Sequence, residues 1–184
     1  MNSSNAAGLG PIAYISGPLQ AAVDIERARR FYELLAEVCC ACGYDAYLPH
    51  QRTDPVHHAN ASARSTFARD LKAVSAADVI VAYVGTPSSG VGAELGIAHE
   101  RRIPVIGLCG PEGVASRFIE GLLGSASEAR LIRYCDEEDC RRLLAAELES
   151  FGERRRLAGN VGGLHRVGSP PRGPLPGEHS SASN

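Results

Sequence analysis

The stretch "DVIVAYVGTPSSGVGAELGIA", residues 78–98, decides the fold. Its first seven residues form a near-continuous apolar run, which is typical of a buried strand in a parallel sheet. A turn rich in glycine and serine follows, and the pattern then predicts a helix that ends near Arg101. The turn has the composition of a phosphate-binding loop, yet it leads to a carboxylate, Glu94, which would repel a phosphate. The stretch therefore predicts an α/β unit whose chemistry depends on Glu94.

Strands and helices alternate on both sides of this unit. Further strands are predicted at residues 12–16, 44–49, 103–108 and 129–134, and further helices at 23–42, 65–76, 114–123 and 136–151. Such alternation favours a parallel sheet with helices on both faces. We therefore expect a flavodoxin-like three-layer sandwich with a five-stranded parallel sheet in the order 2-1-3-4-5.

The periodic pattern covers residues 11–151, which we interpret as one domain. Residues 1–10 are small and polar and predict a flexible N-terminus. From residue 152 onward glycine, proline, serine and arginine prevail, so residues 152–184 predict a disordered tail. Inside the domain, residues 50–65 show no periodicity and predict a long loop of the kind that often carries function.

Composition disfavours several classes of function. The formal net charge is −2, aromatic residues make up 5% and tryptophan is absent, so nothing favours binding to nucleic acid or to a membrane. No signal peptide is visible and the apolar runs are strand-sized, so we expect a cytoplasmic protein without a membrane span. The six cysteines are interpreted as reduced thiols, and we expect neither a metal site nor a cofactor.

In sheets of this kind, ligands bind at the carboxyl ends of the strands, beside the point where the strand order reverses. Residues 17–20 and 85–94 follow the first and third strands, so they should face one crevice that Gly17 and Pro18 help to line. A dinucleotide is disfavoured, because the glycine pattern follows the third strand and not the first. No GxxxxGK[ST] motif of a P-loop is present.

Two acidic residues suit cleavage of a glycosidic bond, in which one carboxylate attacks the sugar and the other handles the proton of the leaving group. Glu94 is predicted near the start of a helix, whose free amides favour the ionised form that a nucleophile needs. Asp70 is predicted on the preceding helix, at the border of an apolar stripe that begins at Phe67. Taken alone, a glutamate at the position of Glu94 is more often a solvated helix residue than a catalytic one, and Asp70 could equally be an exposed helix residue. Gly90 and Gly92 would let a substrate approach Glu94 closely.

Ser88 and His50 are candidates for substrate binding. Ser88 and the free N–H groups of the helix start would seat a phosphate, and the same hydroxyl could instead cap the helix. His50 is the best placed histidine of the loop, because it directly follows the second strand.

Three stretches carry a family resemblance: "YISGPL", "ARDLKAVSAADVIVAYV" and "PSSGVGAELGIA". Together they resemble the nucleoside 2-deoxyribosyltransferase superfamily, and within it the 2′-deoxynucleoside 5′-phosphate N-hydrolases and related CMP N-glycosidases. The resemblance covers most of residues 12–150. It implies that Glu94 attacks C1′ of the sugar, that Asp70 contacts the nucleobase and helps it leave, and that Tyr14 lies beside Glu94.

The same resemblance implies how a phosphate is held. Ser88 matches a hydroxyl on the 5′-phosphate, and Ser116 matches a serine that the neighbouring subunit donates, which implies a homodimer. The chain departs from the N-hydrolases after its first motif, where "GPLQ" replaces a run that carries a serine and an arginine. Arg52 and Arg117 are two candidates to supply the missing cation.

Three functions remain open at this point. The preferred one is an N-glycosidase that cleaves (deoxy)nucleoside 5′-monophosphates to free base and (deoxy)ribose 5-phosphate through a glycosyl-Glu94 intermediate. The second is a transferase that exchanges bases on deoxyribose. The third is a nucleotide-sensing module without turnover, against which the acid pair argues. The expected catalytic residues are Glu94, Asp70 and Tyr14, and the expected substrate-binding residues are Gly17, Pro18, His50, Ser88, Gly90, Gly92 and Ser116.

Overall fold

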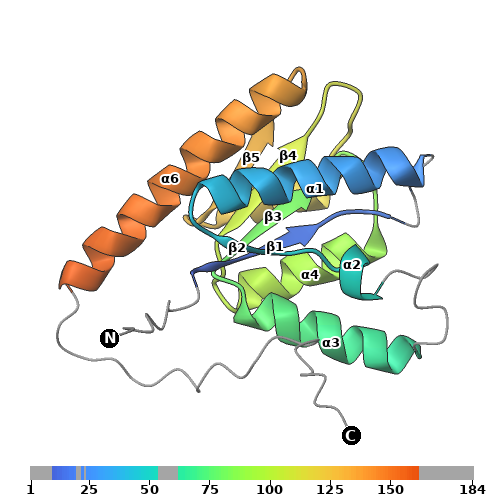
Figure 1. The fold of residues 1–184 in the computed structure, drawn as a ribbon, viewed down its shortest axis with the longest axis horizontal. Helices are drawn as coiled ribbons and strands as arrows, with labels where there is room; N and C mark the ends of the chain where they lie inside the picture. The colour runs from blue at the N-terminus through green and yellow to red at the C-terminus, as the bar shows by residue number, and fades with distance from the viewer. Residues whose placement is uncertain (1–9, 20–21, 23, 54–61, 162–184) are drawn as a thin grey trace, which may run out of the picture.

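The computed structural model describes residues 10–19, 22, 24–53 and 62–161 (Figure 1). The strands are β1 Ile12–Ser16, β2 Asp45–Tyr47, β3 Val79–Tyr83, β4 Val105–Cys109 and β5 Ala129–Arg133. The helices are α1 Ile25–Ala41, α2 His50–Thr53, α3 Ala63–Ala76, α4 Ser89–Glu100, α5 Arg117–Ser125 and α6 Glu137–Val161. Neighbouring strands are parallel in the order β2-β1-β3-β4-β5, so the predicted topology is confirmed.

Helices cover both faces of the sheet, as Figure 1 shows for α1 and α6 on one side and α3 and α4 on the other. Each face has its own apolar core, one with α1 and α6 and one with α3, α4 and α5. Residues of β1 alternate between the cores: Ala13 and Ile15 face α1, whereas Tyr14 faces α3 and α4. Ser16 shares the face of Tyr14, because it lies two residues further along the strand.

Side-chain caps fix the positions at which the helices begin. The hydroxyls of Ser88 and Ser116 accept hydrogen bonds from the backbone N–H groups of Val91 and Ile119, at the starts of α4 and α5. Asp136 accepts from the N–H of Asp139 at 2.8 Å, and it therefore starts α6 as predicted. Both serine caps follow the carboxyl ends of strands, so they lie on the edge of the sheet where ligands bind in this architecture.

Three details of the segment between β2 and β3 differ from the prediction. The predicted loop begins with a short helix, α2, and α3 starts at Ala63 after the cap Ser62, two residues earlier than expected. Residues 54–61, which include His57 and His58, lie outside the described residues. Phe67 was predicted to begin the apolar stripe of this helix, but it is 62% exposed, and the buried residues of α3 are Ala73 and Val74.

The last helix continues to Val161, so the predicted helix end at residue 151 and the predicted disorder of residues 152–161 were wrong. Phe151 is buried, and the guanidinium of Arg154 lies 4.3 Å from the centre of its ring. One helical turn beyond Phe151, the guanidinium of Arg155 lies 2.8 Å from the carboxylate of Asp78. The same carboxylate accepts a hydrogen bond from the backbone N–H of Ile12. These contacts stabilise the helix past Gly152. Residues 1–9 and 162–184 lie outside the described residues.

Replacing Arg155 by Ala should destabilise the domain. The partner of Arg155 is the largely buried Asp78, so we expect the free energy of unfolding to fall by about 1 kcal/mol. Arg156→Ala is the matched control, since Arg156 is exposed and contacts the backbone of its own helix. Urea denaturation of both variants measures the difference, and equal midpoints would show that Asp78 does not anchor the end of α6.

Candidate active site

Glu94 is held at both of its carboxylate oxygens by the end of β1. It is the sixth residue of α4, and its side chain reaches the sheet beside Tyr14 and Ser16. The Tyr14 hydroxyl donates a hydrogen bond of 2.7 Å to Oε1, and the Ser16 hydroxyl donates a short hydrogen bond to Oε2. Both donors are fully buried. The carboxylate is therefore fixed in orientation at the carboxyl edge of the sheet.

The electrostatic environment of Glu94 differs from the prediction. Burial raises the pKa of Glu94, because the ionised form loses hydration. The hydrogen bonds from Ser16 and Tyr14 oppose the increase, whereas the negative charge of Asp70 adds to it. The start of α4 does not hold the pKa of Glu94 low, as had been expected. The helix dipole acts within the first turn, and Glu94 lies beyond that turn. The groups that lower the pKa of Glu94 are the hydroxyls of Ser16 and Tyr14, and not the start of the helix.

Asp70 lies on α3, which packs beside α4, and its side chain is half-buried. Its charge raises the pKa of Glu94, and it also adds to the increase in the pKa of Tyr14 that burial and Glu94 cause. Asp70 is thus within electrostatic reach of both groups. The structure brings together the three residues that were expected to be catalytic.

The ring of Tyr14 is fixed from its other side. It stacks on the ring of Tyr47, with centroids 5.6 Å apart and planes inclined by 14°. The two residues are paired across the parallel strands β1 and β2. The stack on Tyr47 therefore holds the Tyr14 hydroxyl toward Glu94. The position of the Glu94 carboxylate thus depends on residues of both β1 and β2.

Sequence reasoning missed Ser16 and Tyr47. Ser16 ends an apolar strand and belongs to no recognisable catalytic spacing. The available signal was alternation, because a residue two places after Tyr14 must share its face. Tyr47 could not be found in this way, since its contact with Tyr14 depends on the register between β1 and β2.

Ser88 and Ser116 line one cavity of about 310 Å³ between the starts of α4 and α5, together with Val84, Thr86, Pro87, Ser89, Val91, Gly92, Phe118 and Ile119. Each serine caps its own helix, so the capping interpretation of Ser88 is correct. The same hydroxyls and helix starts line the cavity, which leaves the phosphate interpretation open. In a single chain, Ser116 therefore lines the same cavity as Ser88 of that chain.

The glycines near these residues play different roles. A Cβ on Gly92 would meet no described atom within 4 Å, and one on Gly90 would meet the Ser88 hydroxyl at 3.8 Å. The space beside them is open, as the clearance for a substrate requires. Gly17 is different, because a Cβ there would lie 2.2 Å from the ring of Tyr32. The Tyr32 hydroxyl also donates to the carbonyl of Pro18 at 3.4 Å, so this turn packs against α1.

His50 begins α2 and packs against α1. Its ring lies 6.2 Å from the ring of Tyr32, and its Nε2 lies 3.8 Å from a carboxylate oxygen of Glu33. These contacts place it beside α1, directly after the carboxyl end of β2. Arg117 is exposed and lines a neighbouring cavity of about 440 Å³, whereas Gln20 and the side chain of Arg52 lie outside the described residues.

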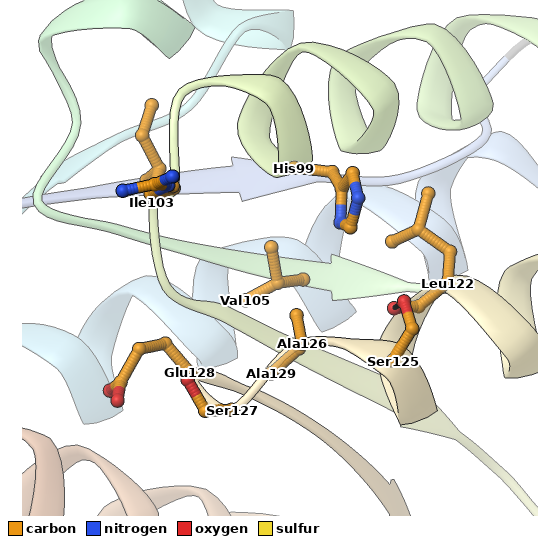
Figure 2. A pocket seen from close by; sticks show the side chains of 10 residues that line it. His99, Ile103, Val105, Leu122, Ser125, Ala126, Ser127, Glu128 and Ala129 are labelled. Atoms are coloured by element: carbon orange, nitrogen blue, oxygen red, sulfur yellow. Dashed lines mark hydrogen bonds between the residues drawn. The ribbon is translucent and has the colours of Figure 1, made fainter.

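A third hollow, of about 320 Å³, lies at the opposite edge of the sheet (Figure 2). Val105 and Ala129, the first residues of β4 and β5, line it together with His99 and Leu122 of the flanking helices. Glu94 contacts the last residue of β1, so in a parallel sheet this hollow and Glu94 lie at opposite ends of the strands. It is separate from the acid pair.

The described part of the chain contains no group of three or more His, Cys, Asp or Glu side chains that could hold a metal ion. Each of the six cysteines is a free thiol. None of the described helices combines the length and the apolar character needed to cross a bilayer.

Residues 13–154 match the nucleoside 2-deoxyribosyltransferase family, and the chain belongs to this family. The match spans β1 through most of α6 and includes Tyr14, Asp70 and Glu94. The predicted family resemblance is confirmed. No curated protein shows significant sequence similarity to the chain.

Solved structures share the fold at low sequence identity. The CMP N-glycosidase BcmB of Clostridium botulinum has a TM-score of 0.57 and 21% identity, over 73% of this chain and 98% of that chain. A conserved protein from Enterococcus faecalis V583 has a TM-score of 0.56 and 22% identity, over 78% and 98%. A 2-deoxyribosyltransferase from Bacillus psychrosaccharolyticus has a TM-score of 0.51 and 19% identity, over 71% and 90%. These likenesses show the fold.

Proposed function

We propose that the chain is an N-glycosidase that hydrolyses (deoxy)nucleoside 5′-monophosphates to free base and (deoxy)ribose 5-phosphate. The observation that carries this proposal is the carboxylate of Glu94, oriented by two buried hydroxyls at the carboxyl edge of the sheet and lying within electrostatic reach of Asp70. Family membership supports chemistry at a nucleoside N-glycosidic bond. A nucleotide sensor would need no oriented nucleophile beside a second acid.

The reaction proceeds in two displacements. An oxygen of Glu94 forms a bond to C1′ as the C1′–N bond breaks, and the bonding pair leaves with the base, which takes up a proton. Asp70 contacts the base and assists this proton transfer. Water then attacks C1′ and loses a proton, and the ester bond to Glu94 breaks. Two inversions at C1′ give net retention.

The cavity between α4 and α5 is the proposed seat of the 5′-phosphate. The start of α4 and the hydroxyl of Ser88 line it, and such donors suit a phosphate. In a homodimer, Ser116 of the partner subunit would complete this seat, and the adjacent Arg117 of the partner subunit would supply the cation that the β1–α1 turn lacks. We place the enzyme in the cytoplasm, where its thiols stay reduced.

A transferase is the second candidate, because the family is named for base exchange. Incubation with nucleosides and nucleoside monophosphates, with and without free adenine, separates the alternatives. Base release from monophosphates alone is expected. Exchange that requires added base would establish the transferase, and binding without turnover would establish the sensor.

Ser88→Asp tests the phosphate seat. Aspartate caps a helix as well as serine does, so the melting temperature should not fall, but its charge repels a phosphate. We expect KM for a monophosphate to rise about 10-fold or more, and cleavage of the matching nucleoside to change little. Ser62→Asp at the cap of α3 is the matched control. An unchanged KM in Ser88→Asp would place the phosphate elsewhere.

We also propose that the active enzyme is a homodimer with Ser116 donated across the interface, as exposed Val114 and Phe118 beside Ser116 would be covered in it. Mixing Glu94→Gln chains with Ser116→Ala chains tests this. If the site is shared, the mixture should regain about a quarter of wild-type activity. About half of the dimers then contain one chain of each variant, and one of the two sites in each of these dimers is intact. Activity no higher than the sum of the two variants would mean that Ser116 serves its own chain.

A further inference from the structure

Ser16 is an unusual residue for its position. Apart from tyrosine and cysteine, it is the only polar residue in the buried interior of the described chain, with 1% of its surface exposed. A buried hydroxyl is costly unless it is hydrogen-bonded, and its partner here is the carboxylate of Glu94. A bond to a charged acceptor is also stronger than a neutral one. The contact therefore has a larger energetic weight than an ordinary serine bond.

The two donors on Glu94 act on different oxygens. Tyr14 holds Oε1 and Ser16 holds Oε2. The terminal torsion of a glutamate side chain is broad, so a single donor would let the carboxylate rotate about its last bond. Two donors from one strand, spaced about 7 Å apart along it, fix that torsion. Tyr14 alone could not do this.

We propose that Ser16 is a positioning residue for Glu94, which sets the orientation of the carboxylate and keeps it ionised for attack on C1′. The role in attack rests on the proposed glycosidase function. The role in orienting and ionising Glu94 rests on the contact itself. Nothing in the family match assigns a function to this serine.

Ionisation of Glu94 depends on few groups. In the described chain, the charged and titratable groups that act on it are Tyr14 from β1 and Asp70 from α3. Burial and Asp70 raise the pKa of Glu94, and the bonds from Ser16 and then Tyr14 lower it. Loss of the Ser16 hydroxyl must therefore raise the pKa of Glu94. The fraction of ionised enzyme then falls at the acid end of the pH range.

Ser16→Ala and Ser16→Cys test the proposal, with Ser75→Ala as the matched control. Cysteine keeps the size of serine and donates only weakly, and the Ser75 hydroxyl bonds to the backbone of α3. Carbon-13 NMR follows the Glu94 carboxyl, whose resonance is assigned by its absence in Glu94→Gln. The expected pKa of Glu94 rises in Ser16→Ala, rises less in Ser16→Cys and stays unchanged in Ser75→Ala.

The pH profile of kcat/KM gives the second readout. In Ser16→Ala the acid limb should move to higher pH, and kcat on the alkaline plateau should fall about 10-fold, because the carboxylate is less well oriented. An unchanged Glu94 pKa in a folded Ser16→Ala protein would overturn the proposal. If the wild type releases no base but the NMR shift is observed, the glycosidase function fails and the role of Ser16 in ionising Glu94 stands.

Discussion

Glu94→Gln should abolish base release while leaving the protein folded. The amide keeps the size of the side chain but cannot form the ester with C1′, so we expect kcat to fall by about 10³-fold or more. The pKa of Glu94 is raised in the folded state, so the ionised side chain destabilises the fold at pH values above that pKa. Removal of the charge should therefore leave the melting temperature at pH 7 equal to that of the wild type or higher.

Two measurements make this result specific to a nucleophile. Glu94→Ala leaves space for a small anion, so formate or azide should restore part of the C1′–N cleavage. Rescue is expected in Glu94→Ala and not in Ser88→Asp, where the nucleophile is intact. Full activity in Glu94→Gln, with a melting temperature like that of the wild type, would contradict the role of Glu94.

Asp70→Asn should lower kcat/KM by about 10²-fold, because assistance to the leaving base is lost. At low pH the same substitution should have a second effect on kcat/KM, which is favourable. The charge of Asp70 raises the pKa of Glu94, so its removal should shift the acid limb of the pH profile to lower pH. The pH dependence of kcat/KM in the two proteins measures both effects.

The leaving group supplies the control for Asp70. A substrate with an N7-methylated purine loses its base without prior protonation, so its cleavage should suffer much less in Asp70→Asn. An equal loss with both substrates would mean that Asp70 orients the substrate and does not help the base to leave. Opposite shifts of the acid limb in Asp70→Asn and Ser16→Ala would show that both residues influence the ionisation of Glu94.

The sheet order was predictable because it follows from alternation and from the rules of parallel crossovers. The apolar run before Gly85 has the length and composition of a buried strand, and every strand after β1 has a helix before and after it. The family stretches then pointed to Tyr14, Asp70 and Glu94. The structure brings these three together from β1, α3 and α4.

The errors have a common physical cause, namely contacts between distant parts of the chain. Gly152 and the arginines after it suggested the end of the helix, but Arg155 forms an ion pair with Asp78, the residue before β3. Gly17 was expected to help line the crevice, and its close packing against Tyr32 of α1 is a long-range contact that the sequence does not show. Ser16 gave no pattern of its own, and only the position of Glu94 reveals its role.

The most direct test of the account is detection of the sugar on Glu94. Wild-type enzyme is mixed with a nucleoside monophosphate, quenched rapidly in acid, digested with trypsin and analysed by tandem mass spectrometry. Cleavage after Lys72 and Arg101 gives a peptide that contains Glu94. We predict a (deoxy)ribosyl 5-phosphate adduct on Glu94, absent from Glu94→Gln. Release of base with inverted configuration at C1′, and with no adduct at Glu94, would contradict the account.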